Sequence, residues 1–148
     1  MKTFLKNSVI AFGTITSLNL ATLAKVYADK TPDVTQIAMA EKSQTFINKK
    51  YAIQGNWTII EKEGQTVLRL SQDFKTKRGP DLKLFLSPSH VENLTGQTAT
   101  QGSVLISSLN TNRGSQDYII PRSVNLTDFK SVIIHCEAFS VLWGGGNL

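Results

Sequence analysis

From Phe46 to the C-terminus, apolar residues occur in short segments separated by turn residues, and this pattern restricts the fold more than any other feature. Leu82, Leu84 and Leu86 alternate with other residues, so they share one face of an extended chain. Two similar segments between residues 57 and 70 are separated by a glycine turn, which predicts a β-hairpin. No long segment has helical spacing. We therefore expect an all-β fold, a single antiparallel β-sandwich or a partly open barrel.

Further strands are predicted where short apolar segments recur, at 102–107, 118–120, 131–136 and 139–143. Residues 110–114 between two of them are rich in turn formers and are predicted as a hairpin turn, with Arg113 and Gly114 at its tip. Residues 144–146 are three glycines and are expected to form a flexible turn after the last strand. The large aromatic side chains are expected to fill the core, namely Trp57, Phe74, Phe85, Tyr118, Phe129, Phe139 and Trp143.

The N-terminus has the pattern of a secretory signal. Lys2 and Lys6 precede an uncharged, mostly apolar stretch at 8–24, and Ala28 provides a small residue for cleavage before Asp29. The alternative interpretation is a retained membrane anchor. The sequence thus predicts a protein outside the cytoplasm, secreted or periplasmic, which contacts the membrane only if this segment stays uncleaved.

The chain divides into a signal peptide, a linker and a β domain, at residues 1–28, 29–45 and 46–148. Removal of the signal takes away three lysines and no acidic residue, which lowers the formal net charge from +5 to +2. A nearly neutral chain does not predict nucleic-acid binding. The short cluster of Lys75, Lys77 and Arg78 is interpreted as a solvated loop rather than a phosphate-binding patch.

Cys136 is the only cysteine of the chain, which excludes an internal disulfide framework and a paired redox motif. Strand alternation places its side chain on the same face as Val132 and Ile134, and places His135 on the opposite face. One interpretation is a small apolar residue buried in the core. The other starts from the export signal, because an unpaired thiol outside the cytoplasm is oxidised unless it is buried or used.

Hydrolytic chemistry is not indicated by the remaining residues. No nucleophile-elbow sequence and no phosphate-binding loop are present. Asp117 and Glu137 are candidate carboxylates near the same strands, although each is expected at the surface. No metal site is predicted, and the sequence leaves open whether the protein is an enzyme.

Three segments in this order and spacing resemble the DM-thirteen domain: Gly79-Pro80-Asp81-Leu82 running into Ser87, Arg113-Gly114 running through Tyr118 to Pro121, and 131–144 with Cys136. The resemblance covers roughly residues 50–148. This domain occurs alone in bacterial exported proteins and beside DOMON cytochrome domains in Skeletor-type animal proteins.

The resemblance implies an electron-transfer role outside the cytoplasm, with a redox partner protein there. It implies that Cys136 is the catalytic residue, acting as a free redox thiol or as the ligand of a prosthetic group such as haem. It also marks six positions as family-motif residues: Gly79, Pro80, Asp81, Arg113, Gly114 and Tyr118.

The same motif residues have a structural interpretation. Gly79 and Pro80 are suited to turn the chain before a strand, and Asp81 is expected to lock that turn by bonding nearby backbone amides. Tyr118 is expected in the core with its hydroxyl at the surface.

The alternative function is a secreted or surface binding and adhesion β-sandwich, in which Cys136 is only core packing. In that case the polar loops at 87–102 and 110–116 would recognise a glycan or a protein.

Overall fold

The computed structural model describes residues 42–148, so the predicted signal peptide and nearly all of the predicted linker lie outside the described residues. The described part consists of strands and three short 3₁₀ turns, and no α-helix occurs in it. The all-β prediction is therefore confirmed. Within these residues there is no helix with the length and apolar character needed to span a membrane.

Eleven strands form within residues 42–148: β1 Gln44–Thr45, β2 Ile47–Asn48, β3 Ile53–Gln54, β4 Asn56–Lys62, β5 Gln65–Leu70, β6 Lys75–Thr76, β7 Leu82–Ser87, β8 Val104–Ser108, β9 Gln116–Ile119, β10 Ser131–Cys136 and β11 Val141–Asn147. The 3₁₀ turns are η1 Val91–Asn93, η2 Leu126–Asp128 and η3 Glu137–Phe139. The expected hairpin is β4 and β5, which turn through Glu63 and Gly64, both at positive φ.

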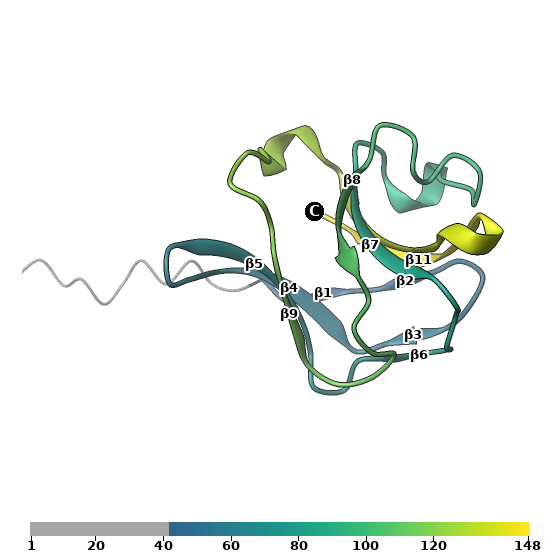
Figure 1. Cartoon of the computed structure of the whole chain (residues 1–148), viewed down its shortest axis with the longest axis horizontal. Coiled ribbons are helices and arrows are strands. Elements are labelled where there is room, and N and C mark those ends of the chain that lie inside the picture. The colour runs from purple at the N-terminus through teal and green to yellow at the C-terminus, as the bar shows by residue number, and fades with distance from the viewer. Residues whose placement is uncertain (1–41) are drawn as a thin grey trace, which may run out of the picture. The chain divides into compact units, whose positions relative to one another are not determined.

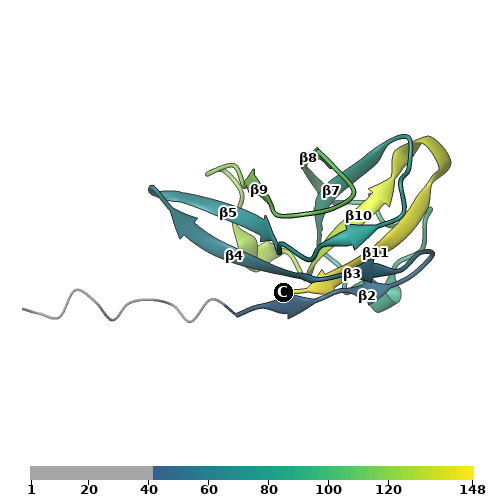
Figure 2. The same ribbon diagram turned by 90° about the horizontal axis from the view of Figure 1, so that it is seen from below.

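The strands form two main antiparallel sheets (Figures 1 and 2). The first sheet has the order β1-β4-β5-β9, and the second has the order β2-β11-β10-β7-β8. At Phe46 the chain passes from β1 in the first sheet directly to β2 in the second. This arrangement is the open, two-sheet alternative of the prediction, a β-sandwich.

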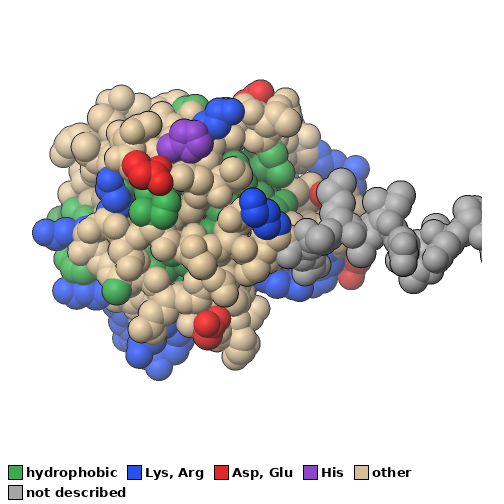
Figure 3. Space-filling model, turned by 180° about the vertical axis from the view of Figure 1, so that it is seen from behind, with side chains coloured by type: hydrophobic (Ala, Val, Ile, Leu, Met, Phe, Trp, Pro, Cys, Tyr) green, Lys and Arg blue, Asp and Glu red, His purple; other side chains and the backbone are tan. Residues whose placement is uncertain are grey.

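A third, two-stranded sheet of β3 and β6 lies at one end of the sandwich. Part of the predicted solvated loop at 75–78 is therefore a strand, since β6 is Lys75–Thr76. The face turned away from Figure 1 shows Lys and Arg side chains gathered over this end of the molecule (Figure 3).

The main core lies between the two sheets and contains fourteen buried side chains: Ile53, Trp57, Leu68, Leu70, Phe74, Leu82, Leu84, Leu86, Tyr118, Ile120, Val132, Ile134, Cys136 and Trp143. The alternate residues of the second sheet point to its other face, where Phe85, Ile133 and Leu142 pack against Val91 and Leu94 of the segment that follows β7. Both faces of this sheet are covered, which explains why every residue of β10 is buried.

The predicted flexible turn at 144–146 is wrong, because all three glycines belong to β11 and are buried. Gly145 pairs with Ile133 of β10, and a Cβ atom on Gly145 would collide with the backbone oxygen of Val132. The glycines are required by the close approach of neighbouring backbones rather than by flexibility.

The predicted hairpin at 110–114 is also wrong. β8 pairs with β7 in the second sheet and β9 pairs with β5 in the first, so the segment between β8 and β9 connects the two sheets. Gly114 has φ +81°, and its N–H donates to the carbonyl oxygen of Phe74 at 2.8 Å. Arg113 forms an isolated antiparallel bridge with Lys75.

Two of the aromatic core residues are placed differently from the prediction. Phe139 lies at the end of η3 with 68% of its surface exposed, and the last strand begins only at Val141. Phe129 is half-buried at the edge of the main core. The other five expected aromatic side chains are buried, which confirms their role in packing.

Candidate functional site

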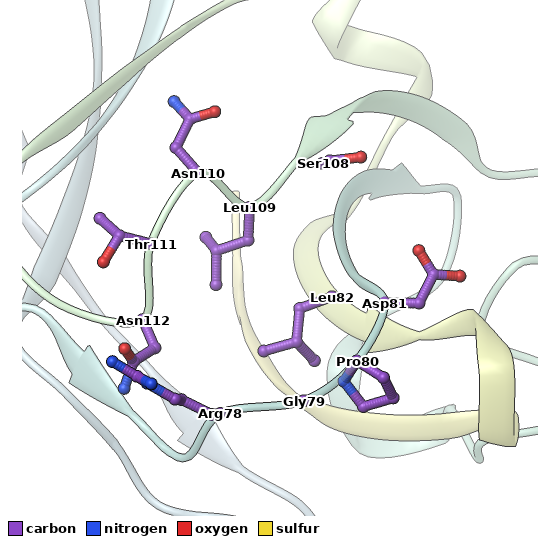
Figure 4. Close-up of a pocket in the computed structure, with 10 residues that line it drawn as sticks. All are labelled: Arg78, Gly79, Pro80, Asp81, Leu82, Ser108, Leu109, Asn110, Thr111 and Asn112. Carbon is purple, nitrogen blue, oxygen red and sulfur yellow. The ribbon is translucent and has the colours of Figure 1, made fainter.

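A pocket of about 380 Å³ lies between the segment that leads into β7 and the segment that follows β8. Its lining is Arg78, Gly79, Pro80, Asp81, Leu82, Ser108, Leu109, Asn110, Thr111 and Asn112. Figure 4 shows the two segments facing each other across the pocket, with the side chains of Leu82 and Leu109 pointing between them. The three family-motif residues of the Gly-Pro-Asp turn therefore form one wall.

Asp81 fixes the turn at 79–82 through two contacts, one of its backbone and one of its side chain. The carbonyl oxygen of Asp81 accepts a hydrogen bond from the backbone N–H of Glu137 at 3.1 Å. Its carboxylate pairs with the ammonium group of Lys83 at 3.4 Å, and no bond to a nearby amide is formed, so the expected amide lock is wrong. Lys83 also bonds the carboxylate of Glu137, and this hydrogen bond raises the pKa of Lys83.

The opposite wall is held by a buried hydrogen-bond network under residues 110–114. The Tyr118 hydroxyl donates to Oε1 of Gln116 at 2.6 Å and accepts from the backbone N–H of Asn110 at 3.0 Å. Oε1 of Gln116 also accepts from the N–H of Thr111, and its amide nitrogen donates to the carbonyl oxygens of Thr111 and Gly114. One buried glutamine thus satisfies both backbone groups of Thr111 and the carbonyl oxygen of Gly114.

Tyr118 is only 3% exposed, so the expectation that its hydroxyl reaches the surface is wrong. Burial raises the pKa of Tyr118, because the charged phenolate would lose solvation there. The hydroxyl acts as a neutral structural group that connects β9 to the pocket wall.

Cys136 is the strand neighbour of a residue that lines the pocket. It is the last residue of β10 and pairs with Leu82 at the start of β7, and Leu82 is itself part of the pocket lining. The Cys136 side chain is fully buried in the main core together with Val132 and Ile134, as strand alternation predicted. Its sulfur makes no hydrogen bond to any residue of the described chain.

His135 points to the other face of the sheet, as predicted. Its ring and the ring of Phe85 are nearly perpendicular, in a T-shaped arrangement. Its Nε2 lies 2.8 Å from the carbonyl oxygen of Gly96. Nδ1 is buried without a partner among the described residues. His135 and Cys136 are therefore on opposite sides of β10 and do not act on one group.

The residues present do not fit a haem ligated by Cys136. A thiolate ligand needs an open position at the sulfur, whereas Cys136 is fully enclosed and does not line the pocket. Nor do residues 42–148 contain a group of three or more His, Cys, Asp or Glu side chains that could hold a metal ion.

The structure brings together Gly79, Pro80 and Asp81 in the pocket wall, with Tyr118 behind the facing wall. Arg113 and Gly114 do not line the pocket. The prediction that Gln116 ends an exposed loop at 110–116 is wrong, because Gln116 begins β9 and is buried. The available signal was its spacing of two residues from Tyr118, which puts both side chains on one face of a strand.

Asp117, which faces outward between these two residues, forms an exposed ion pair with Arg69 and a second with Lys62. The hydrogen bond from Arg69 lowers the pKa of Asp117 from 3.8 to about 2. Because the pKa is depressed in the folded state, the stabilisation is present above about pH 4 and is lost as the pH falls towards 2. We expect Asp117→Asn to cost less than about 1 kcal/mol at pH 7 and only a small part of that at pH 2, measured by urea unfolding. An equal cost at both pH values would contradict this assignment.

These features define a small all-β domain in which a polar pocket lies beside a single enclosed thiol. Residues 45–146, more than half of the 148-residue chain, match the protein family described as electron transfer DM13. The chain belongs to this family, which confirms the resemblance found in its sequence. No curated protein and no solved structure gives a significant match to the chain.

Proposed function

We propose that the protein is an exported electron-transfer module whose redox group is the thiol of Cys136. The family description supports a redox-related role, and the N-terminal sequence supports export. The observation that carries the proposal is the position of Leu82, which lines the pocket on one side and pairs with Cys136 on the other. The residue paired with the only cysteine of the chain across the sheet is thus part of the pocket lining, next to Gly79, Pro80 and Asp81.

The reaction that a single thiol supports is exchange with a disulfide of a partner protein. The Cys136 thiolate attacks one sulfur of the partner disulfide, the new S–S bond forms, and the second partner sulfur leaves as a thiolate. The proton released from Cys136 goes to solvent or to the leaving sulfur. Cys136 is oxidised and the partner sulfur is reduced, so no further reactant is needed.

This reaction requires that Cys136 becomes accessible by local opening at Leu82. The start of β7 is a suitable place, because it follows a turn and the facing residue Cys136 ends its own strand. Local openings of this kind need less free energy than global unfolding.

The proposal predicts the rate at which iodoacetamide alkylates Cys136 in the folded protein. We expect Leu82→Ala to raise this rate at least about tenfold, because it removes the barrier between the pocket and the sulfur. The control is Leu86→Ala, which removes a similar buried side chain from the same face of β7 opposite Val132. If both variants raise the rate in proportion to their loss of stability, Cys136 is reached only by global unfolding and the proposal fails.

A second function is favoured by the complete burial of Cys136 and by the lack of any polar partner for its sulfur. In it the protein is a binding β-sandwich, the pocket holds a ligand, and Cys136 contributes only packing. Cys136→Ala would then cost about 1 kcal/mol of stability and leave binding at the pocket unchanged.

A further inference from the structure

Five basic residues belong to the small sheet of β3 and β6 or to the segments next to it, and we refer to Lys50, Lys75, Lys77, Arg78 and Arg113 as the basic ridge. All five are exposed. Lys75 pairs with Gln54 across the small sheet and forms a bridge with Arg113. The chain then continues through Lys77 to Arg78. Arg78 lines the pocket between residues 78–82 and 108–112, which we call the motif pocket.

The ridge is fixed to the core by aromatic contacts. The ammonium group of Lys77 lies 4.6 Å from the ring centroid of Tyr51, and the Tyr51 ring packs on Trp143 at 4.3 Å between centroids. The indole N–H of Trp143 donates to the carbonyl oxygen of Lys77 at 3.3 Å. Because Lys50 precedes Tyr51, this packing brings it to the same end of the molecule. Lys77 is therefore held in place rather than freely extended.

None of the five ridge side chains forms an ion pair within residues 42–148. The salt bridges in this part of the chain involve other cations, namely Lys62, Arg69 and Lys83. Two carboxylates are near the ridge in the sequence: Asp81 pairs with Lys83, whereas Asp73 keeps its full negative charge, since its hydrogen bond comes from the neutral Ser71 hydroxyl. Five cations therefore stand against one carboxylate that has no ion pair among the described residues. The surface therefore carries unbalanced positive charge, which attracts anions.

Ridge residues line two pockets. The motif pocket is on the side of Arg78 and offers the polar side chains of Asn110, Thr111 and Asn112. A second pocket of about 390 Å³ is lined by Tyr51, Ala52, Gln54, Lys75, Thr76 and Lys77. Each volume is in the range that holds a small-molecule unit such as a sugar ring.

We propose that the basic ridge binds an anionic polysaccharide, with successive sugar units in the two pockets and carboxylates on the lysines between them. A single small anion would reach only one or two of the five cations, whereas a chain of repeated charges uses all of them. The ridge has none of the large exposed apolar side chains of residues 42–148, which are Leu105, Ile119, Phe139 and Leu148. It therefore lacks the apolar anchors that a bilayer surface or a stable protein interface would use.

The test is calorimetric titration of the mature chain with a hexamer of galacturonate, with monomeric galacturonate and with neutral maltohexaose. We expect the hexamer to bind, the monomer to bind far more weakly, the neutral hexamer not to bind, and the affinity for the anionic hexamer to fall with added salt.

The double variant Lys75→Gln/Lys77→Gln should lose about tenfold in affinity. The single variant Arg113→Gln, in which both lysines remain, should lose less.

Lys130→Gln is the matched control, because Lys130 is exposed and lies outside the ridge. An equal loss in this control would show a non-specific charge effect and overturn the proposal. Tighter binding to vesicles of phosphatidylglycerol or to poly-L-glutamate than to galacturonate would assign the ridge to a membrane or to an acidic protein and would also overturn it. The outcome is independent of the thiol chemistry, since Cys136→Ala should bind the hexamer as the wild type does.

Discussion

Gly145→Ala is expected to lower the free energy of unfolding by about 3 kcal/mol, the upper end of the usual cost of overpacking. The added methyl group would collide with the backbone oxygen of Val132 and would also press on Ile133 and Val91. A backbone atom in the centre of a sheet does not move aside as a flexible side chain does. Equilibrium unfolding in urea, followed by tryptophan fluorescence, measures the change.

Gly114→Ala is the control that separates crowding from backbone conformation. Gly114 has φ +81° but no atom within 4 Å of its added Cβ position, so only the cost of a left-handed backbone applies, about 1 kcal/mol. If Gly145→Ala costs no more than Gly114→Ala, the close packing of β11 against β10 is refuted.

Gln116→Leu is expected to cost about 3 kcal/mol, because the apolar side chain keeps the volume but removes four hydrogen bonds. Three of the abandoned groups, the Tyr118 hydroxyl and the two backbone groups of Thr111, then lack the partner that the glutamine provided. The pocket wall at 110–112 should lose its fixed position. Amide hydrogen exchange of Thr111 should become faster together with the drop in stability.

Tyr118→Phe provides the comparison for this network. It removes one hydroxyl and leaves the amide bonds of Gln116 to Thr111 and Gly114 in place. Its expected cost is about 1 kcal/mol, and the exchange rate of Thr111 should change little. Equal costs for the two variants would show that Gln116 does not hold the wall by itself.

The fold could be predicted because its main signals are local. Strand alternation at Leu82, Leu84 and Leu86, and again at Val132, Ile134 and Cys136, requires only that one face of each strand is buried. The structure places all six side chains in the same core. The hairpin of β4 and β5 was likewise apparent from the glycine between two apolar segments.

The wrong predictions concern features that depend on distant parts of the chain. Three consecutive glycines indicate flexibility when they are considered alone, and only the approach of β2 and β10 on either side explains why they form a strand. Residues 110–114 have the composition of a hairpin turn, and nothing within them shows that the strands on either side belong to different sheets.

The candidate site was predictable only in part. The Gly79-Pro80-Asp81 turn and Cys136 were recognised from the sequence. The pocket was not, because its second wall depends on Gln116 and Tyr118, whose partners are set by the tertiary structure. The ion pair between Asp81 and Lys83 depends in the same way on the geometry at the start of β7.

The passage of the chain between the two sheets at Phe46 affects the order of folding. Strand β2, immediately after Phe46, pairs Ile47 with Gly145 and Asn48 with Gly144, so the first part of the domain to be synthesised has the last part as its partner. Such pairing has a high loop-closure cost, and it forms only once β11 has been synthesised. The two sheets therefore stay unconnected at this edge until β11, the last strand of the domain, has been synthesised.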